Sequence, residues 1–173
     1  MNKHKAKNKH FLNVLRQRLN LHLDNASTFT ACPSERDFRV WIWQALKNEY
    51  RHADISLILL DEEDARTYNR DYRGKDYATN VLSFAFNEGE MFNPATADGI
   101  VGDLIICPQV VASEASEQGK DLTAHFAHLT IHGTLHLMGY DHMNDAEAKE
   151  MENLEIKLLQ QLNYPNPYAE DEY

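Results

Sequence analysis

The sequence predicts an α/β (α+β) fold, in which a single domain is built from one mixed sheet of about four strands packed with helices. Two observations lead to this prediction. Short segments in which apolar and polar residues alternate are interleaved with longer segments whose apolar residues recur at helical spacing, and the C-terminal half is helical. The length of 173 residues suits one domain with one core.

The first four elements alternate between strand and helix. The pattern predicts a strand over residues 19–23, a helix over 34–49, a strand over 55–59 and a helix over 61–72. Ser34 is a suitable N-cap for the first helix, because its hydroxyl can accept a hydrogen bond from a free backbone N–H. Gly74 is expected to end the second helix, since glycine adopts the left-handed conformation common after a helix C-terminus.

Two more strands are expected in the centre of the chain. They run from Thr79 to Phe86 and from Ile100 to Cys107, and the turn-rich segment 87–99 between them could rim an active-site cleft. Pro108 then starts a short helix that Gly119 interrupts.

Two long helices complete the predicted domain. Asp121 or Thr123 caps the first of them, and Asn144 begins a last amphipathic helix that runs to about Leu162. The residues from 163 onwards are expected to be loose.

Charge divides the chain into three predicted parts, a basic, flexible extension over residues 1–18, one domain over 19–168 and a loose acidic tail over 169–173. The extension holds six of the 17 Lys and Arg residues and no acidic residue, which leaves 11 basic against 27 acidic residues in the remainder. Such an acidic body is not expected of a general nucleic-acid binder, and DNA is not predicted as a partner. Any RNA contact must therefore be made by a local basic patch.

The sequence carries no signal for membrane insertion or secretion. Its apolar runs are far shorter than the ~18 residues that suggest a membrane-spanning helix, and no apolar stretch follows the basic N-terminus. Cys32 and Cys107 belong to no C-x-x-C pair and are expected to be buried apolar residues. A cytoplasmic protein without membrane partners is predicted.

The most informative motif is I-H-G-T-L-H-L-M-G-Y-D-H at residues 131–142. His132 and His136 lie one helical turn apart and project from nearly the same face. If the helix continued, His142 would lie ~9 Å along and ~120° around it, out of reach of the same ion. Gly139 can supply the turn that brings His142 back. The motif predicts a three-histidine site at the C-terminal end of a long helix, with one zinc ion per chain, or nickel or another transition metal in its place.

The spacing of this motif is also that of zinc proteases, with one departure. Gly133 stands where those proteases carry the glutamate that acts as general base. A zinc metallopeptidase is therefore an alternative function, but a weak one. Three histidines with no fourth protein ligand leave an open position, as in catalytic zinc sites. A Gly133→Ala change is expected to be tolerated within the helix.

Three segments closely resemble the YbeY family of bacterial endoribonucleases: 132–142 in the motif, Y-R-G-K-D-Y-A-T-N-V-L-S-F at 72–84 and G-D-L-I-I-C at 102–107. The match runs in collinear order from about Leu19 to Tyr168. The resemblance implies a single-strand-specific, metal-dependent endoribonuclease that acts in 16S rRNA 3′-end maturation and ribosome quality control. The implied partners are the single-stranded 16S rRNA precursor, the small ribosomal subunit and assembly factors.

The same resemblance assigns functional residues. It implies that His132, His136 and His142 are the metal ligands and that Arg73 is the catalytically important arginine. Without the resemblance, Arg73 would be interpreted as a cation that favours a helix C-terminus by ~0.3 to 1 kcal/mol. A guanidinium can also bind a phosphate through two parallel hydrogen bonds, and this becomes the expected role.

Several neighbouring residues are secondary candidates. Lys75 is a candidate phosphate contact, and Asp103 and Asp141 are candidates for orienting the site, with a structural hydrogen bond as the alternative for each. His125 and His128 are expected to have structural or solvated roles, although His128 could support His132.

The expected chemistry is hydrolysis of an RNA phosphodiester by a zinc-activated water, with Arg73 neutralising the developing charge. Attack by a 2′-hydroxyl that leaves a cyclic phosphate is equally compatible with these residues, and no general base is identifiable. A non-catalytic, metal-containing ribosome-assembly factor is the remaining alternative.

Overall fold

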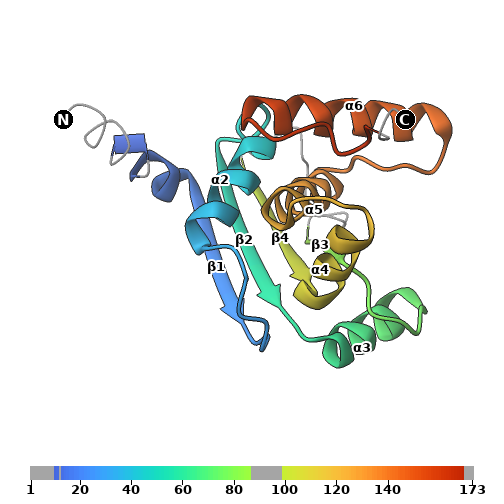
Figure 1. The fold of residues 1–173 in the computed structure, drawn as a ribbon. Helices are drawn as coiled ribbons and strands as arrows, with labels where there is room; N and C mark the ends of the chain where they lie inside the picture. Colours follow the sequence, from blue (N-terminus) through green and yellow to red (C-terminus); the bar gives the residue numbers. More distant parts are fainter. Residues whose placement is uncertain (1–9, 12, 87–98, 170–173) are drawn as a thin grey trace.

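The strands form one mixed four-stranded sheet, as the sequence predicts (Figure 1). The computed structural model describes residues 10–11, 13–86 and 99–169. The strands are β1 (Leu19–Asn25), β2 (His52–Leu59), β3 (Val81–Ala85) and β4 (Gly99–Ile106), in the spatial order β1-β2-β4-β3. β1, β2 and β4 are parallel, whereas β3 is antiparallel to β4. β3 therefore forms an edge of the sheet although it precedes β4 in the chain.

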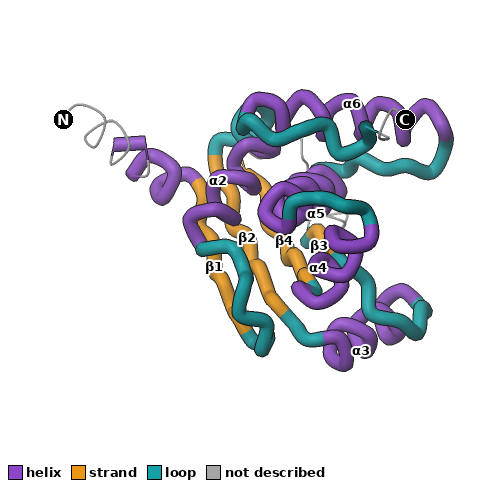
Figure 2. The backbone as a smooth tube through the Cα atoms, viewed as in Figure 1, coloured by secondary structure: helices purple, strands orange, loops and turns teal. Residues whose placement is uncertain are grey.

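A central helix organises the packing around this sheet. The helices are α2 (Glu35–Leu46), α3 (Glu62–Arg73), α4 (Pro108–Glu117), α5 (Leu122–Leu137) and α6 (Asp145–Gln161). α5 packs against β3 and β4 and also against α2, α4 and α6. Figures 1 and 2 show α6 at one end of the molecule and α3 at the other, with α5 between them. The helix that carries the histidine motif is thus the centre of the fold.

The strands contribute alternate residues to two apolar clusters. In β4, Leu104 and Ile106 belong to the main core together with Phe126 of α5, whereas Ile105 belongs to a smaller cluster with Ala65 of α3. This alternation follows from the two-residue period of a strand, which sends successive side chains to opposite faces. α5 therefore covers one face of the sheet and α3 packs on the other.

The predicted helix ends agree closely with the structure. Ser34 caps α2 in a capping box, and Asn144 caps α6. Asp121, and not Thr123, caps α5, because its carboxylate accepts a hydrogen bond from a free backbone N–H of the first turn. Gly74 follows α3 with φ of 69°, the left-handed conformation expected of it.

The structure differs from the sequence-based expectation near both ends of the domain. Residues 13–18, within the predicted extension, are helical and lead into β1, and Leu15 is buried in the main core. The expectation of a loose segment from residue 163 is wrong for residues 163–168, since Tyr164 packs edge-on against Trp41 with 6.3 Å between ring centroids. The predicted rim loop lies outside the described residues, apart from Gly99.

Within residues 10–11, 13–86 and 99–169, no helix combines the length and the hydropathy needed to cross a bilayer.

Gly133 lies where α5 packs closely on the sheet. A Cβ added at this position would come 2.8 Å from Val81 Cγ2 and 3.1 Å from Leu104 Cδ2. Both contacts are tighter than ordinary van der Waals distances, and the branched Val81 side chain has few rotamers with which to move away. The expectation that alanine is tolerated at Gly133 is therefore wrong, because it considered the helix without the sheet.

We expect Gly133→Ala to lower the free energy of unfolding. Overpacking costs about 1 to 3 kcal/mol, and the better helix propensity of alanine offsets roughly 1 kcal/mol of that cost. Urea denaturation of the variant and the parent protein measures the difference. A variant as stable as the parent would show that the distance between α5 and β3 adjusts freely.

Candidate metal centre

Three histidines of the motif meet at the C-terminal end of α5. His132 Nε2 and His136 Nε2 lie 3.1 Å apart, and the His142 ring centroid lies 5.8 Å from that of His132 and 5.0 Å from that of His136. One nitrogen from each ring lies within 4.8 Å of the others, so the group could hold a metal ion. The structure thus brings together the three residues that the motif singled out.

The chain reaches this geometry by turning back after α5. Gly139 has φ of 96°, in the left-handed region, as the sequence predicts. The Tyr140 backbone N–H donates to the Leu135 carbonyl, at 3.1 Å, and closes the end of the helix. Asp141 Oδ1 then accepts a hydrogen bond from the His142 backbone N–H at 2.7 Å. Asp141 therefore acts as a cap of the turn, one of the two roles considered for it.

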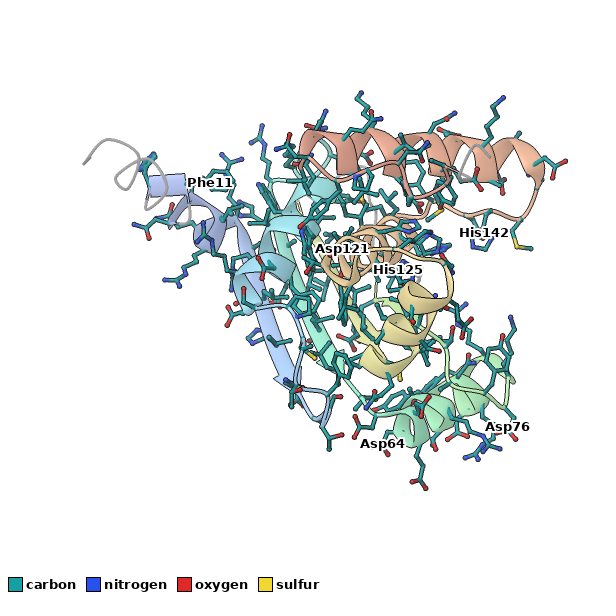
Figure 3. The ribbon with its side chains drawn as sticks, in the orientation of Figure 1. Phe11, Asp64, Asp76, Asp121, His125 and His142 are labelled. Atoms are coloured by element: carbon teal, nitrogen blue, oxygen red, sulfur yellow. The ribbon has the colours of Figure 1, made fainter. Side chains whose placement is uncertain are left out.

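The third histidine lies apart from the helix. Figure 3 shows His142 on the segment between α5 and α6, whereas His125 lies on α5 itself. His142 is exposed, and His132 and His136 are half-buried. The site therefore opens towards solvent on the side of His142.

A buried carboxylate supports the site from behind. Glu155 of α6 is fully buried, and its Oε1 lies 2.6 Å from His132 Nδ1. Its Oε2 lies 2.9 Å from His128 Nε2 and is also hydrogen-bonded by the Tyr168 hydroxyl. Burial opposes ionisation of Glu155, but the hydrogen bonds from His128 and His132 outweigh it and lower the pKa of Glu155 to about 2.

The ionised Glu155 determines how His132 faces the cluster. A carboxylate only accepts hydrogen bonds, so His132 Nδ1 must carry the proton and donate it. The lone pair is then on His132 Nε2, the nitrogen that lies next to His136. His136 is oriented similarly, because its Nδ1 lies 2.9 Å from the Tyr140 carbonyl oxygen and donates to it. Both rings therefore present Nε2 for metal binding.

Glu155 was missed from the sequence although a signal for it was present. It falls on the apolar stripe of α6 with Met151, Leu158 and Leu159, all of which are buried. A charged residue on the buried side of an amphipathic helix is rarely tolerated without a partner. That position on α6 could have been singled out before the structure was known.

The other two histidines of α5 are buried and paired with acids. His125 Nε2 lies 2.9 Å from Glu114 Oε2, and burial lowers the pKa of His125 more than Glu114 raises it. His128, His132 and Glu155 also satisfy the distances of a metal-binding group. Since Glu155 already accepts hydrogen bonds from both rings, this second group is best explained as support for His132.

A cleft of about 580 Å³ extends from the histidine cluster. The side chains that line it and can bind substrate include Arg73, Lys75, Ser83, His132, His136 and His142. Arg73 Nη2 donates to the Ser83 carbonyl oxygen at 3.0 Å, which holds the guanidinium at the cleft. Arg73 and Lys75 form the local basic patch that an acidic protein needs for contact with phosphate.

The electrostatics of the cleft favour a neutral His136 imidazole and an anionic substrate. The pKa of His136 is lowered, mainly by burial and further by the neighbouring His132 and His142. A neutral imidazole is the form that binds metals. Asp141 is the one acidic side chain that lines the cleft among the described residues, and its carboxylate is engaged with the backbone of His142.

Gly133, which stands where zinc proteases carry a glutamate, provides no carboxylate next to the histidines. Its carbonyl oxygen accepts a hydrogen bond from Ser83 Oγ at 2.8 Å, and it has no side chain to act as a base. Asp103, the other acidic candidate, is half-buried in β4 opposite Ser56 and Phe84. It does not line the cleft that the described residues form.

The chain matches known proteins over most of its length. A sequence model of the family described as Endoribonuclease YbeY matches residues 22–163. An Endoribonuclease YbeY of Neisseria meningitidis serogroup C is 66% identical over 163 residues, which cover 94% of this chain and 95% of that protein. An Endoribonuclease YbeY of Chromobacterium violaceum is 49% identical over 167 residues, which cover 96% and 98%.

The fold is also found in a solved structure. The solution structure of a Thermotoga maritima protein has a TM-score of 0.52 with this chain at 19% identity, and the match covers 90% of this chain and 99% of that one. At this identity the likeness supports the fold alone. The family model and the relatives that match along nearly the whole chain show that this protein belongs to the Endoribonuclease YbeY family and is an endoribonuclease.

Proposed function

We propose that the chain cleaves single-stranded RNA in this cleft with the help of one metal ion, most suitably zinc, bound by His132, His136 and His142. The observation that carries the proposal is the convergence of three imidazole nitrogens within 4.8 Å in a cleft that Arg73 also lines. Imidazole suits zinc, nickel, copper and iron, and three protein ligands leave positions open for substrate and water.

The residues of the site have distinct tasks in this proposal. A bound transition metal would supply a Lewis acid that acidifies a water molecule and polarises a phosphoryl oxygen. Glu155 holds His132 with Nε2 facing the ion, and the Tyr140 carbonyl does the same for His136. Arg73 keeps further N–H groups for the scissile phosphate, where they stabilise the additional negative charge of the transition state. Attack by water and attack by a 2′-hydroxyl use the same contacts.

The proposed cellular substrate is the 3′ end of the 16S rRNA precursor, and the proposed setting is the cytoplasm, on the small ribosomal subunit and with its assembly factors. The family membership and the capacity of the cleft for phosphate support this assignment. Mapping of 16S rRNA 3′ ends in cells without the gene should reveal unprocessed ends, which the parent protein restores and a His132→Ala variant does not. Normal ends without the gene would contradict it.

The molecular activity is tested with metal-loaded protein on four substrates: single-stranded RNA, duplex RNA, single-stranded DNA and casein. We expect cleavage of single-stranded RNA alone, and loss of this cleavage in His132→Ala. Cleavage of casein would support the zinc metallopeptidase alternative instead. Unchanged RNA cleavage by His132→Ala would show that the histidine cluster is not the active site.

The metal content offers a separate prediction. We expect about one transition-metal ion per chain in the parent protein and a strong loss of it in His136→Ala, because two imidazoles hold an ion much more weakly than three. Elemental analysis after gel filtration measures both. His22→Ala, on the exposed side of β1, is a matched control that should retain the ion. Full metal content in His136→Ala would mean that the ligand set is different.

A further inference from the structure

We propose that Tyr68, Tyr72 and Phe84, here called the aromatic ladder, stack with unpaired bases of the RNA next to the cleavage site. This role rests on the function proposed above, since it requires single-stranded RNA in the cleft. The ladder joins the last two turns of α3 to β3. It would give the enzyme a base-binding surface in addition to its phosphate contacts.

The three rings form a continuous aromatic surface. Tyr68 and Tyr72 lie four residues apart on one face of α3, and their rings stack with centroids 5.8 Å apart and planes 18° apart. Phe84 meets the Tyr72 ring edge-on, at 5.4 Å and 66°. Tyr72 is therefore held between two other rings, which fixes its orientation before any ligand binds.

The two tyrosines of the ladder are directed to solvent, whereas Phe84 is half-buried against the smaller apolar cluster and anchors them to the sheet. Tyr72 is 66% exposed and Tyr68 is 36% exposed, whereas the buried residues of α3 are Ala65 and Asn69. Large aromatic side chains grouped on a surface frequently mark a binding site, because water is a poor environment for their faces. The packing of α3 on the sheet does not account for these two tyrosines.

The ladder adjoins the cleft through Arg73, although none of its three rings lines the cleft itself. Arg73 Cζ lies 5.8 Å from the centre of the Phe84 ring, so the guanidinium extends the row of flat groups. Arg73 is in turn bonded to the Ser83 carbonyl, and both residues line the cleft with the three histidines. Tyr77, another exposed aromatic residue, lines the same cleft. A strand that places a phosphate at Arg73 would bring its neighbouring bases to the ladder.

The distribution of charge along α3 favours a nucleic acid as the occupant. The first turn carries Glu62, Glu63 and Asp64, whereas the last turn carries Arg73 and also Arg70, which is paired with Asp71 at 3.1 Å. Lys75 follows immediately and lines the cleft. The basic end therefore attracts a phosphate backbone at the place where the ladder meets the cleft.

The ladder also offers a physical basis for preferring unpaired RNA. Bases in a duplex are already stacked and paired, whereas unpaired bases can be splayed out onto aromatic side chains. Every base has a flat face, so this contact tolerates different sequences. The ladder would select single strands without reading a sequence, while the metal site determines where the bond breaks.

The test compares metal-loaded, full-length variants in the cleavage of a short single-stranded RNA. Stacking on one aromatic side chain is worth roughly tenfold in affinity, so Tyr72→Ala should raise KM about tenfold and leave kcat close to that of the parent. Tyr72→Trp should retain the parent KM, because it keeps a flat ring. Phe11→Ala is the matched control, since Phe11 is 54% exposed and lies far from His142 in Figure 3.

A second set of substrates separates base stacking from other roles of Tyr72. In each of these substrates a single base is removed while its sugar and phosphate remain. Removal at one or two positions beside the cleaved bond should raise the KM of the parent. Tyr72→Ala should be insensitive to base removal at those positions, because the contact is already missing. Melting temperatures confirm that Tyr72→Ala and Tyr68→Ala remain folded.

The outcomes distinguish this inference from the proposed function. If the parent cleaves single-stranded RNA but Tyr72→Ala and Tyr68→Ala have the parent KM, the ladder does not bind RNA and the proposed function stands. If the parent does not cleave RNA at all, the proposed function is wrong, and the inference that rests on it is overturned as well. If both variants cleave normally but no longer associate with the small ribosomal subunit, the ladder is a docking surface for that subunit and not a base-binding surface beside the cleaved bond, and the inference is overturned.

Discussion

Arg73→Glu should abolish RNA cleavage while the fold and the metal content remain those of the parent. The substitution replaces a guanidinium that lines the cleft with a carboxylate that repels the phosphate. Loss of one preorganised donor to a transition state costs about a hundred- to a thousandfold in kcat, and the reversed charge adds to this loss. Single-turnover cleavage and elemental analysis of the same preparation measure the two quantities.

The matched variant for this prediction is Arg73→Lys. It keeps the positive charge but loses the fork that forms two parallel hydrogen bonds and the contact with the Ser83 carbonyl. We expect activity between those of the parent and Arg73→Glu. Turnover by Arg73→Glu at the parent rate would show that Arg73 serves only to end α3, as its place before Gly74 suggests when the sequence is considered alone.

Glu155→Gln should weaken metal binding although no metal ligand is changed. The glutamine side chain is uncharged, so its carbonyl oxygen is a weaker acceptor for the N–H of His132 Nδ1 than the carboxylate is. The imidazole is then oriented poorly and is a weaker base. Loss of such a supporting carboxylate typically costs about 10- to 100-fold in metal affinity. Competition with a chromophoric chelator measures the affinity without reference to enzyme activity.

Two further variants test whether the loss of metal affinity is specific to the Glu155 carboxylate. Glu152→Gln, an exposed position on the same helix, should leave the affinity unchanged. Tyr168→Phe removes the hydroxyl that bonds Glu155 and should weaken affinity less than Glu155→Gln does, because His128 still holds the carboxylate. If Glu155→Gln bound metal as tightly as the parent, Glu155 would be a purely structural buried acid.

The same carboxylate has a predictable effect on acid stability. Its pKa of about 2 in the folded protein lies below the ordinary value of 4.5, so ionised Glu155 stabilises the fold above about pH 4.5. That contribution is lost as the pH falls from 4.5 towards 2. Urea denaturation of metal-free protein over this range should show a steeper loss of stability in the parent than in Glu155→Gln. Equal slopes would mean that Glu155 does not contribute to acid unfolding.

Local features of the chain were predictable because they depend on residues close in sequence. His132 and His136 share a face since a helix has about 3.6 residues per turn, and Gly139 takes the left-handed conformation that the return of His142 requires. The caps at Ser34 and Asn144 follow from the same kind of short-range chemistry. Strand positions were also predictable, because alternation of apolar residues is a local pattern.

The contacts between distant segments could not be predicted in this way. β4 inserts between β2 and β3, and this order places Ser83 beside Gly133 and brings Arg73 to the histidine cleft. Without the family resemblance, no pattern in the sequence connects Arg73 with His132. Glu155 likewise reaches His132 only because α6 packs on α5.

Gly133 illustrates the physical reason for the difference. Considered within its helix, alanine at this position is favourable, because the backbone loses less conformational freedom on folding. In the folded protein, Val81 and Leu104 occupy the space that a methyl group would need. The metal-binding motif is a property of one helix and its turn, whereas the closeness of that helix to the sheet, the position of Arg73 and the support from Glu155 depend on how separate elements pack, which their individual periodicities do not encode.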